Sequence, residues 1–510
     1  MTNGWIDIKN TDMMLIMGGN PAENHPCGFK WAIEAKRQRN AKMIVVDPRF
    51  TRTAAVADQF VQLRAGSDIA FLGGLIRFAI ENNRIARDYL IHYTNAAFIV
   101  REDFKLPEDG LYSGFDAATH AYDKATWNYE GPGEANPAAM PGAPAYDLTL
   151  QHPRTVFQLL KRHYSRYTPE MVERITGVPK DQFLKTADLF TSIRKDGDMK
   201  KAATIIYAVG WTQHSSGTQT IRGAAILQLL LGNVGRAGGG VNALRGHSNI
   251  QGATDMAGIF DLLPGYLKVP TPADKDFKAY LERITPKPSK PGPWDSLNYW
   301  SNTPKFAVSL LKAFYGDAAT KENDWAFHYL PKVDRKYSWV EIWDDMYHGK
   351  VKGLLAFGMN GVSIGPNSHK NIAALKKAEW LVVCEIYPDE TSEFWKSPGI
   401  TKEEMAKIQT TVYRLPGAGF AEKDGTFVNS ARWLQWKGAA LPPPPGAGWT
   451  RRFWRGFSSG HATCIKRKAA NSPTRSCTPH GTTPIRTTPH SLKSPGKSTA
   501  GPSSMSLIPN

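Results

Sequence analysis

Three stretches of the chain follow one order, in which an apolar run ends in a glycine turn and leads into a helical segment. The first stretch runs from MMLIMGG (13–19) through FKWAIEAKRQRN (29–40) to a second apolar run, AKMIVVD (41–47). The second leads from TIIYAVG (204–210) to a predicted helix, RGAAILQLLLGNVG (222–235). The third passes from GLLAFGMN (353–360) through a helix at 371–378 to WLVVCEI (380–386). This order is typical of α/β units with parallel strands, and the chain is long enough for several domains.

The three glycine turns allow two interpretations. Glycine lets backbone N–H groups approach a phosphate closely, so three similar turns suggest binding sites for phosphate groups. Glycines also close the turns of any α/β protein, whatever it binds. Neither GxGxxG nor GxxxxGK[ST] occurs in the chain, so an ordinary Rossmann or P-loop site is not supported.

The net charge of +17 is unevenly distributed. Residues 451–510 hold ten Lys and Arg and no Asp or Glu, and the first 450 residues carry a net charge of only +7. A near-neutral body with a basic tail does not predict a nucleic-acid partner.

Two further classes of feature are not expected. The chain has no run of eighteen apolar residues, which argues against a direct membrane span, and its first residues do not form a secretion signal. The four cysteines, Cys27, Cys384, Cys464 and Cys477, lie far apart without a CxxC pair. We therefore expect neither an iron–sulfur cluster nor a structural zinc site in this chain.

Several segments predict irregular structure. Residues 105–150 are rich in Gly, Pro and Ala, and residues 264–304 are Pro-rich and predict a surface excursion. LPPPPGAG (441–448) marks a break. Beyond it, Ser, Thr, Pro and basic residues dominate, and by composition 451–510 is disordered.

Five motifs carry a resemblance to a known family. They are MGGNPAENHPCGFKWAIEA, VVDPRFTRTAAVAD, GWTQHSSGTQ, LLLGNVGRAGGGVNALRGHSNIQGATDM and FAEKDGTFVNSARWLQW. In this order they resemble the catalytic (alpha) subunit of respiratory, membrane-associated formate dehydrogenases, in the dimethyl sulfoxide reductase superfamily of molybdopterin oxidoreductases. The resemblance extends from residue 1 to about residue 440.

The resemblance implies a fold and a cofactor. The family holds molybdenum or tungsten between two molybdopterin guanine dinucleotides and has two doubly wound parallel-sheet domains around them. By analogy, one α/β domain covers residues 1–245, a second covers 246–435, and 436–450 form a linker. We expect the N-terminal iron–sulfur domain with its [4Fe–4S] cluster, the C-terminal cap domain and the selenocysteine or cysteine metal ligand to be missing from this chain. An internal start after a selenocysteine codon would account for the missing front.

The resemblance also implies the residues that bind the cofactor. Gly18, Gly19 and Asn20, with Glu23 and Asn24, would wrap one diphosphate. Asp47 suits a ribose or guanine, and Arg49 a phosphate. Asp68 would either contact guanine or cap a helix. The remaining members of the predicted cofactor set are Gly210, Trp211 and Gln213 near a pterin, Gly358, Met359 and Asn360 at the other dinucleotide, and Glu385 at a later strand end; the role of His214 stays open.

Arg245 is the predicted substrate residue. In RGHSNIQGATDM it aligns with the arginine that binds substrate in the family. A guanidinium fork matches the two oxygens of formate. The alternative is a buried salt bridge to an acid such as Asp255. His247 is a second candidate for the catalytic set, with a structural or helix-capping role equally open.

The implied function is oxidation of formate to carbon dioxide, with electrons passed to iron–sulfur clusters. The implied partners are an iron–sulfur beta subunit and a membrane cytochrome b subunit, and full-length members of the family are periplasmic. Two alternatives remain: another oxo-transfer reductase of the same superfamily, or an inactive truncated gene product.

The tail from Trp449 onward predicts a frameshift. Acidic residues and hydrophobic periodicity stop there, and back-translation at a constant offset of two nucleotides gives acidic, amphipathic segments. The alternative is a genuine Ser/Thr/Pro linker.

Overall fold

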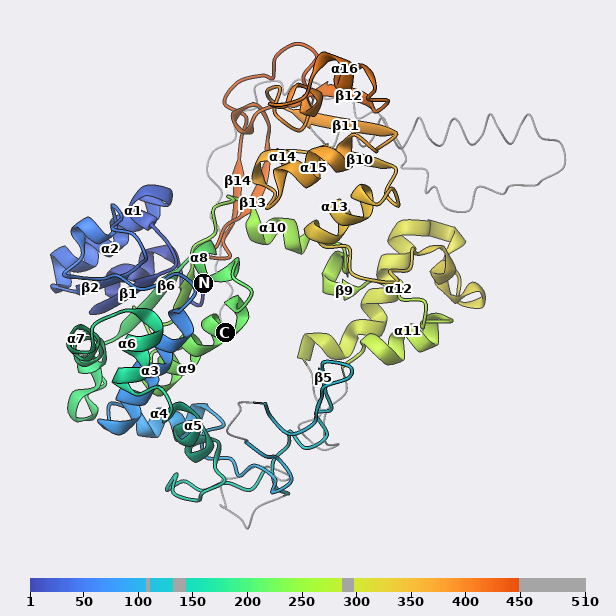
Figure 1. Cartoon of the computed structure of the whole chain (residues 1–510). Helices are drawn as coiled ribbons and strands as arrows, with labels where there is room; N and C mark the ends of the chain where they lie inside the picture. Colours follow the sequence, from blue (N-terminus) through green and yellow to red (C-terminus); the bar gives the residue numbers. More distant parts are fainter. Residues whose placement is uncertain (107–110, 132–143, 287–297, 449–510) are drawn as a thin grey trace, which may run out of the picture. The chain divides into compact units, whose positions relative to one another are not determined.

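The computed structural model describes residues 1–106, 111–131, 144–286 and 298–448 (Figure 1). The described residues form two compact units. One is drawn from Met1–Tyr266 and Tyr337–Gly448, and the other from Leu267–Pro286 and Tyr299–Lys336. The predicted frameshift from Trp449 and the predicted disorder of 451–510 lie outside the described residues.

A five-stranded parallel sheet forms the centre of the first unit. Its order is β3-β2-β1-β6-β7, with β1 at Met13–Met17, β2 at Lys42–Val46, β3 at Gln59–Val61, β6 at Ala203–Tyr207 and β7 at Val241–Ala243. The chain moves outward from β1 to β3 and then returns to the other side of β1 as β6. The direction of winding therefore changes between β1 and β6, and open α/β sheets bind ligands at such a switch point.

Helices cover both faces of this sheet, so it is doubly wound. Met13, Leu15 and Met17 point into a core shared with α3 (Asp68–Glu81), α7 (Lys180–Thr191) and α9 (Gly217–Leu230). Met14 and Ile16 point into the opposite core with α2 (Pro26–Arg39). Every residue of β1 is buried, as expected for a parallel strand covered on both faces. The predicted α/β class with parallel sheets is confirmed.

The three expected helices form, and each begins and ends earlier in the chain than the sequence predicted. The helix expected over 29–40 is α2, whereas the helix expected over 222–235 is α9 and ends earlier, at Leu230. Gly232 and Gly235 have φ angles of +62° and +80°, a left-handed conformation that a helix interior does not accommodate. These glycines end the helix although the apolar pattern continues beyond it.

A second parallel sheet, in the order β10-β11-β12, lies in the C-terminal part of the same unit. Its strands are β10 (Gly353–Phe357), β11 (Trp380–Glu385) and β12 (Thr411–Pro416), packed with α13 (Trp339–Tyr347) and α15 (Ser368–Leu375) around a core that includes Phe394. An antiparallel hairpin follows, formed by β13 (Gly425–Val428) and β14 (Leu434–Lys437). Both sheets fall within the predicted α/β domains, whose limits at 245 and 435 stay predictions.

The second compact unit is helical. Its main elements are α11 (Phe277–Ile284), α12 (Thr303–Tyr315) and the 3-10 segment Lys321–Tyr329. The rings of Tyr280 and Phe327 lie 5.0 Å apart, and Arg283 pairs with the buried Asp274 at 2.7 Å. Helix α11 lies in the Pro-rich segment that was expected to be irregular, so that expectation was wrong for 277–284. The missed signal is Asp276, whose side chain accepts the N–H of Ala279 and caps the helix.

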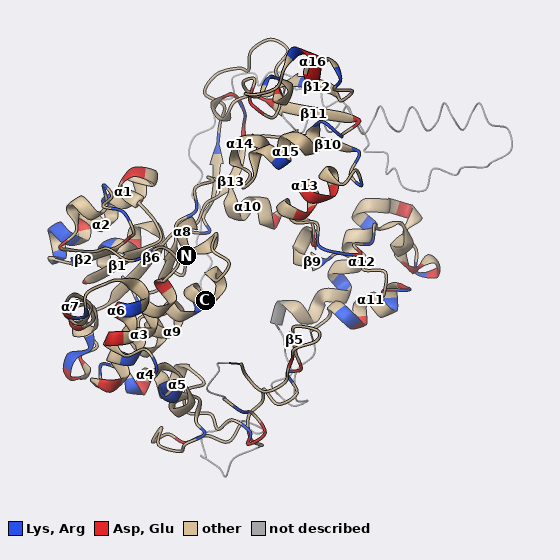
Figure 2. Cartoon of the chain, in the orientation of Figure 1, with Lys and Arg blue, Asp and Glu red and all other residues tan. Residues whose placement is uncertain are grey.

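The remaining elements are short. They are α1 (Pro21–Asn24), α4 (Arg87–Tyr93), α5 (Val156–Tyr164), α6 (Pro169–Thr176), α8 (Val209–Thr212), α10 (Ile250–Asp255), α14 (Gly361–Ile364), α16 (Lys402–Ala406), β4 (Phe115–Asp116), β5 (Ala121–Tyr122), β8 (Leu262–Leu263) and β9 (Leu267–Lys268). Within the described ranges, no helix has the length and apolar character needed to cross a bilayer. Figure 2 shows both signs of charge spread over the described elements, with acidic residues prominent on α13.

Candidate cofactor and substrate site

The turns after β1 and β6 meet at the switch point of the first sheet. The carbonyl oxygen of Gly18 accepts hydrogen bonds from the N–H groups of Ala208 (3.1 Å) and Gly210 (3.0 Å). Gly18 has a φ of +65°, and a Cβ added to it would lie 2.6 Å from Trp211 Cδ1. A Cβ on Gly210 would lie 2.6 Å from the Gly18 oxygen. Both glycines are therefore required for the close packing of the two turns.

Asn20 holds the first turn in place. Its side-chain oxygen accepts the Thr53 hydroxyl at 2.7 Å, and its amide donates to Glu23 at 2.8 Å. Because Asn20 is buried and both ends of its side chain are bonded, it shapes this loop through its side chain. The backbone N–H groups of Gly19 and Asn20 have no partner among the described residues, and Asn24 is exposed at the end of α1.

Asp47 and Arg49 follow the end of β2. The Arg49 N–H donates to Asp47 Oδ1 at 2.9 Å, while the Arg49 side chain is exposed. Burial raises the pKa of the Asp47 carboxyl above its usual range, and the Arg49 N–H partly offsets that rise. The pair offers a partly buried acceptor beside an exposed cation, which is the combination predicted for a ribose or base and a phosphate.

Asp68 and Trp211 contact each other. The indole Nε1–H of Trp211 donates to Asp68 Oδ1 at 2.9 Å in a buried hydrogen bond. The Trp211 ring is fully buried and stacks on Tyr207 at 5.0 Å. Trp211 therefore presents only backbone to a ligand, whereas the side chains of Gln213 and His214 are exposed.

Three segments of the chain hold Arg245, which follows β7. Its N–H donates to Ser430 Oγ at 3.0 Å, and its carbonyl oxygen accepts from His25 Nε2 at 3.0 Å. Its guanidinium Nη1 donates to Thr212 Oγ1 at 2.7 Å. Asp255, the acid considered as its partner, instead accepts the hydroxyl of Tyr266. Among the described residues, no acid pairs with Arg245.

His247 is exposed and locally bonded. Its Nδ1 accepts the N–H of Asn249 at 3.0 Å, just before helix α10. An accepting Nδ1 places the proton of the neutral ring on Nε2.

The turn after β10 has the same strand-end position in the second sheet. Gly358 has a φ of +67°, and a Cβ added to it would meet nothing within 4 Å, so the space beside it is open. Glu385, at the end of β11, accepts the N–H of Met359 at 2.5 Å, and burial raises the pKa of its carboxyl. Asn360 accepts the Thr391 hydroxyl at 2.9 Å and caps α14.

A cavity of about 300 Å³ lies at the ends of β11 and β12. Its lining includes Glu385, Tyr387, Ser392 and Arg414. A carboxylate, an aromatic ring, a hydroxyl and a guanidinium together can recognise one half of a dinucleotide by stacking and hydrogen bonding.

The sequence interpretation missed three residues that contact Arg245. His25 and Thr212 lie inside quoted motifs but received no role, and Ser430 lies in FVNSARW, 185 residues further along the chain. The only signal in the sequence was their position within the motifs that carry the resemblance.

Comparisons with known proteins agree with the resemblance. The family model described as Molybdopterin oxidoreductase matches residues 1–395. The nitrate-inducible formate dehydrogenase major subunit of Escherichia coli K12 is 50% identical over 445 residues, covering 87% of this chain and 42% of that protein. Formate dehydrogenase 2 subunit alpha (cytochrome c-553) of Nitratidesulfovibrio vulgaris Hildenborough is 46% identical over 446 residues, with the same coverage of 87% and 42%.

Among solved structures, acetylene hydratase from Pelobacter acetylenicus matches with a TM-score of 0.48 and 16% identity, covering 89% of this chain and 49% of that chain. The chain spans about two fifths of the length of the curated relatives named above. The family model covers well over half of the chain. This chain belongs to the molybdopterin oxidoreductase family.

Proposed function

We propose that this chain forms the part of a formate dehydrogenase large subunit that holds a pair of molybdopterin guanine dinucleotides and orients formate for oxidation to carbon dioxide. Relatives about 50% identical to it are formate dehydrogenase major subunits. The observation that carries the proposal is that the Arg245 guanidinium is held in position and has no acidic partner among the described residues.

Arg245 fits the binding of a small carboxylate. Within the described ranges Thr212 engages Nη1 alone, so the other guanidinium donors are available for the two oxygens of formate. Ser430 and His25 fix the backbone on both sides of its Cα, which limits the positions that the fork can reach. A fork held in this way binds a planar anion at low entropic cost.

The residues at the two strand-end turns fit a dinucleotide cofactor. The N–H groups of Gly19 and Asn20, which have no partner in the described part of the chain, lie at the switch point, where diphosphates bind in open α/β sheets. The open space at Gly358 and the polar cavity beside Glu385 offer a second place of the same kind. Asp47 would accept from a ribose or guanine, and Arg49 would face a phosphate.

The protein supplies binding and orientation. When bound, the molybdenum or tungsten centre of the cofactor supplies the two-electron redox chemistry. Arg245 would bind the carboxylate and align its C–H bond, and the exposed Nε2–H of His247 would take part in proton exchange near the substrate. We propose that electrons then pass to iron–sulfur clusters, in a periplasmic complex with an iron–sulfur beta subunit and a membrane cytochrome b subunit.

The test is Arg245→Lys in the assembled, cofactor-loaded enzyme. Lysine keeps the charge but loses the bidentate fork, so kcat/KM for formate should fall at least about thirtyfold, roughly 2 kcal/mol of transition-state binding. Pterin content, measured by fluorescence after oxidative release, should stay unchanged. Arg432→Lys, at an exposed arginine of the hairpin loop, is the matched control. Wild-type turnover by Arg245→Lys would refute the assignment.

A further inference from the structure

A second cavity, of about 520 Å³, lies in the first α/β region away from the residues described above. Helices α3, α5 and α9 form one side of it, and residues from the irregular stretches 100–106 and 112–129 form the other. None of the predicted cofactor or substrate residues lines it. Its volume falls within the range of small-molecule pockets, about 300–1,000 Å³.

Aromatic rings dominate the irregular wall. Trp127 meets Tyr112 edge to face at 5.8 Å and Phe104 at 6.4 Å. The opposite wall contributes Leu160 of α5 and Ile226 of α9. Aromatic walls of this kind bind flat apolar molecules through large contact areas at low entropic cost.

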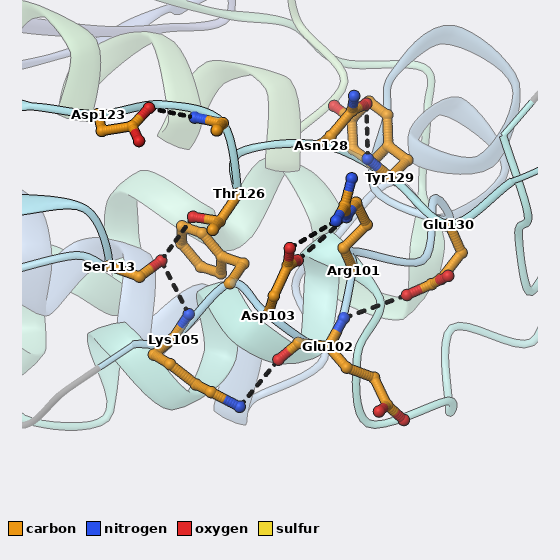
Figure 3. A network of polar contacts seen from close by, with 12 residues as sticks. Arg101, Glu102, Asp103, Lys105, Ser113, Asp123, Thr126, Asn128, Tyr129 and Glu130 are labelled. Carbon is orange, nitrogen blue, oxygen red and sulfur yellow. Dashed lines mark hydrogen bonds and ion pairs between the residues drawn. The ribbon is translucent and has the colours of Figure 1, made fainter.

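The irregular wall is held by its own polar network, which Figure 3 shows. Ser113 Oγ lies 2.9 Å from Thr126 Oγ1 and accepts the N–H of Lys105 at 3.1 Å. The Trp127 indole donates to the Ser113 carbonyl at 2.9 Å. Arg101 pairs with Asp103 at 2.5 Å. The cavity is thus largely formed before any ligand binds.

One buried polar atom in the cavity wall has no partner. His163 Nδ1, at the end of α5, is buried and makes no hydrogen bond within the described part of the chain. Burial, assisted by the charge of Arg166, lowers the pKa of this imidazole, so the ring is neutral at pH 7. This nitrogen has no accessible surface, so His163 lines the cavity through the rest of its neutral ring.

Two arginines lie at the cavity. Arg222 of α9 lines it, and Arg166 lies beside it with its Nε donating to the His163 carbonyl. Among the described residues, no acid lines the cavity and neither arginine forms an ion pair. A ligand with an anionic group would therefore bind beside positive charge that no acid neutralises among the described residues.

We propose that this cavity is a binding site for a small, planar aromatic molecule that carries an anionic group. The rings of Trp127 and Tyr112 would contact its apolar body, and Arg222 would pair with the anion. The neutral ring of His163 would add to this contact area. A volume of about 520 Å³ fits a small molecule.

The test uses the full 510-residue chain and two probes with one ring system. 8-Anilinonaphthalene-1-sulfonate is anionic, and N-phenyl-1-naphthylamine is its neutral counterpart. Fluorescence titration should give one saturable site for each. Ile226→Trp fills the cavity and should raise both dissociation constants at least tenfold. Ile33→Trp, at an exposed isoleucine of α2, is the matched control and should leave them unchanged.

The charge is tested separately. The side chain of Arg222 is exposed, so Arg222→Gln should not affect folding. It should weaken binding of the sulfonate about tenfold and change binding of the neutral probe less than twofold. Leu159→Trp, on the other helix of the wall, repeats the filling test if Ile226→Trp lowers the unfolding midpoint in urea.

Three outcomes would overturn the proposal. Equal weakening of both probes by Arg222→Gln would exclude a role for the anion. Undiminished binding by a folded Ile226→Trp or Leu159→Trp variant would place the probes elsewhere. Loss of both probe signals in the enzyme assembled with its partner subunits would show that polypeptide covers the cavity.

Discussion

Trp211 donates a buried hydrogen bond of 2.9 Å to Asp68, a residue 143 positions earlier in the chain. The bond joins the turn after β6 to the first residue of α3. Trp211 also packs against the place where a Cβ on Gly18 would lie. One side chain thus connects both turns of the switch point to a helix on the core face of the sheet.

Trp211→Phe should lower the free energy of unfolding by about 2 kcal/mol, because it leaves a buried carboxylate oxygen without its donor. Urea unfolding followed by circular dichroism measures the change. Trp433→Phe removes an exposed indole and should change stability by less than about 0.5 kcal/mol. Equal effects of the two substitutions would show that the Asp68 bond contributes nothing.

Gly18→Ala and Gly358→Ala should lower the free energy of unfolding by different amounts, although both glycines have a positive φ. At Gly358 the new methyl group meets nothing within 4 Å, so the cost is the backbone strain alone, about 1 kcal/mol. At Gly18 the methyl group would also collide with Trp211, so the loss should exceed about 3 kcal/mol. Comparable unfolding midpoints for the two variants would contradict this close packing.

The pair of Asp274 and Arg283 should make stability depend on pH. The hydrogen bonds from Arg283 lower the pKa of Asp274 to about 2, from 3.8. Because the pKa of Asp274 is lower in the folded state, the pair stabilises the folded protein at pH values above the unfolded pKa of 3.8. This stabilisation is lost as the pH falls toward 2. Asp274→Asn should therefore cost roughly 2 kcal/mol at pH 7 and about half of that at pH 3. If the difference in unfolding free energy between the wild type and Asp274→Asn is the same at pH 7 and pH 3, the pKa of Asp274 is not linked to stability.

Arg194 should be a large contributor to stability. It is fully buried and donates to the side chain of Asn233 and to four carbonyl oxygens, of Ile193, Asp198, Lys201 and Leu231. Arg194→Met keeps much of the volume but removes the buried donor of these five acceptors, so the loss should be at least about 3 kcal/mol. Arg37→Met, on the exposed surface of α2, serves as the control and should be close to neutral. Thermal unfolding of the two variants distinguishes them.

The strands and their parallel class could be predicted because apolar runs such as Met13–Met17 are buried on both faces and end in glycine turns. Helix α11 was missed because nearby prolines dominated the composition, although Asp276 carried a capping signal. The partner of Asp68 was also missed. The local sequence predicts that Asp68 caps a helix or contacts a ligand. Only the fold brings Trp211 within hydrogen-bond distance of it.

The same limit applies to the candidate site. The motif around Arg245 predicted the residue, but His25 and Ser430 reach it through contacts that span 220 and 185 positions. The aromatic cavity was not predicted either, because its walls come from α3, α5, α9 and a segment with no regular periodicity.

The hydrogen bond between Arg245 and Ser430 sets an order of events during synthesis. The N–H of Arg245 receives its partner only after 185 further residues have been added. At about 5–20 residues per second, this interval lasts roughly ten to forty seconds on the ribosome. A nascent chain in this interval already contains both turns of the switch point but lacks the hydroxyl that fixes the backbone of Arg245. The joined turns and the anchored Arg245 are therefore completed at different times in the life of the same polypeptide.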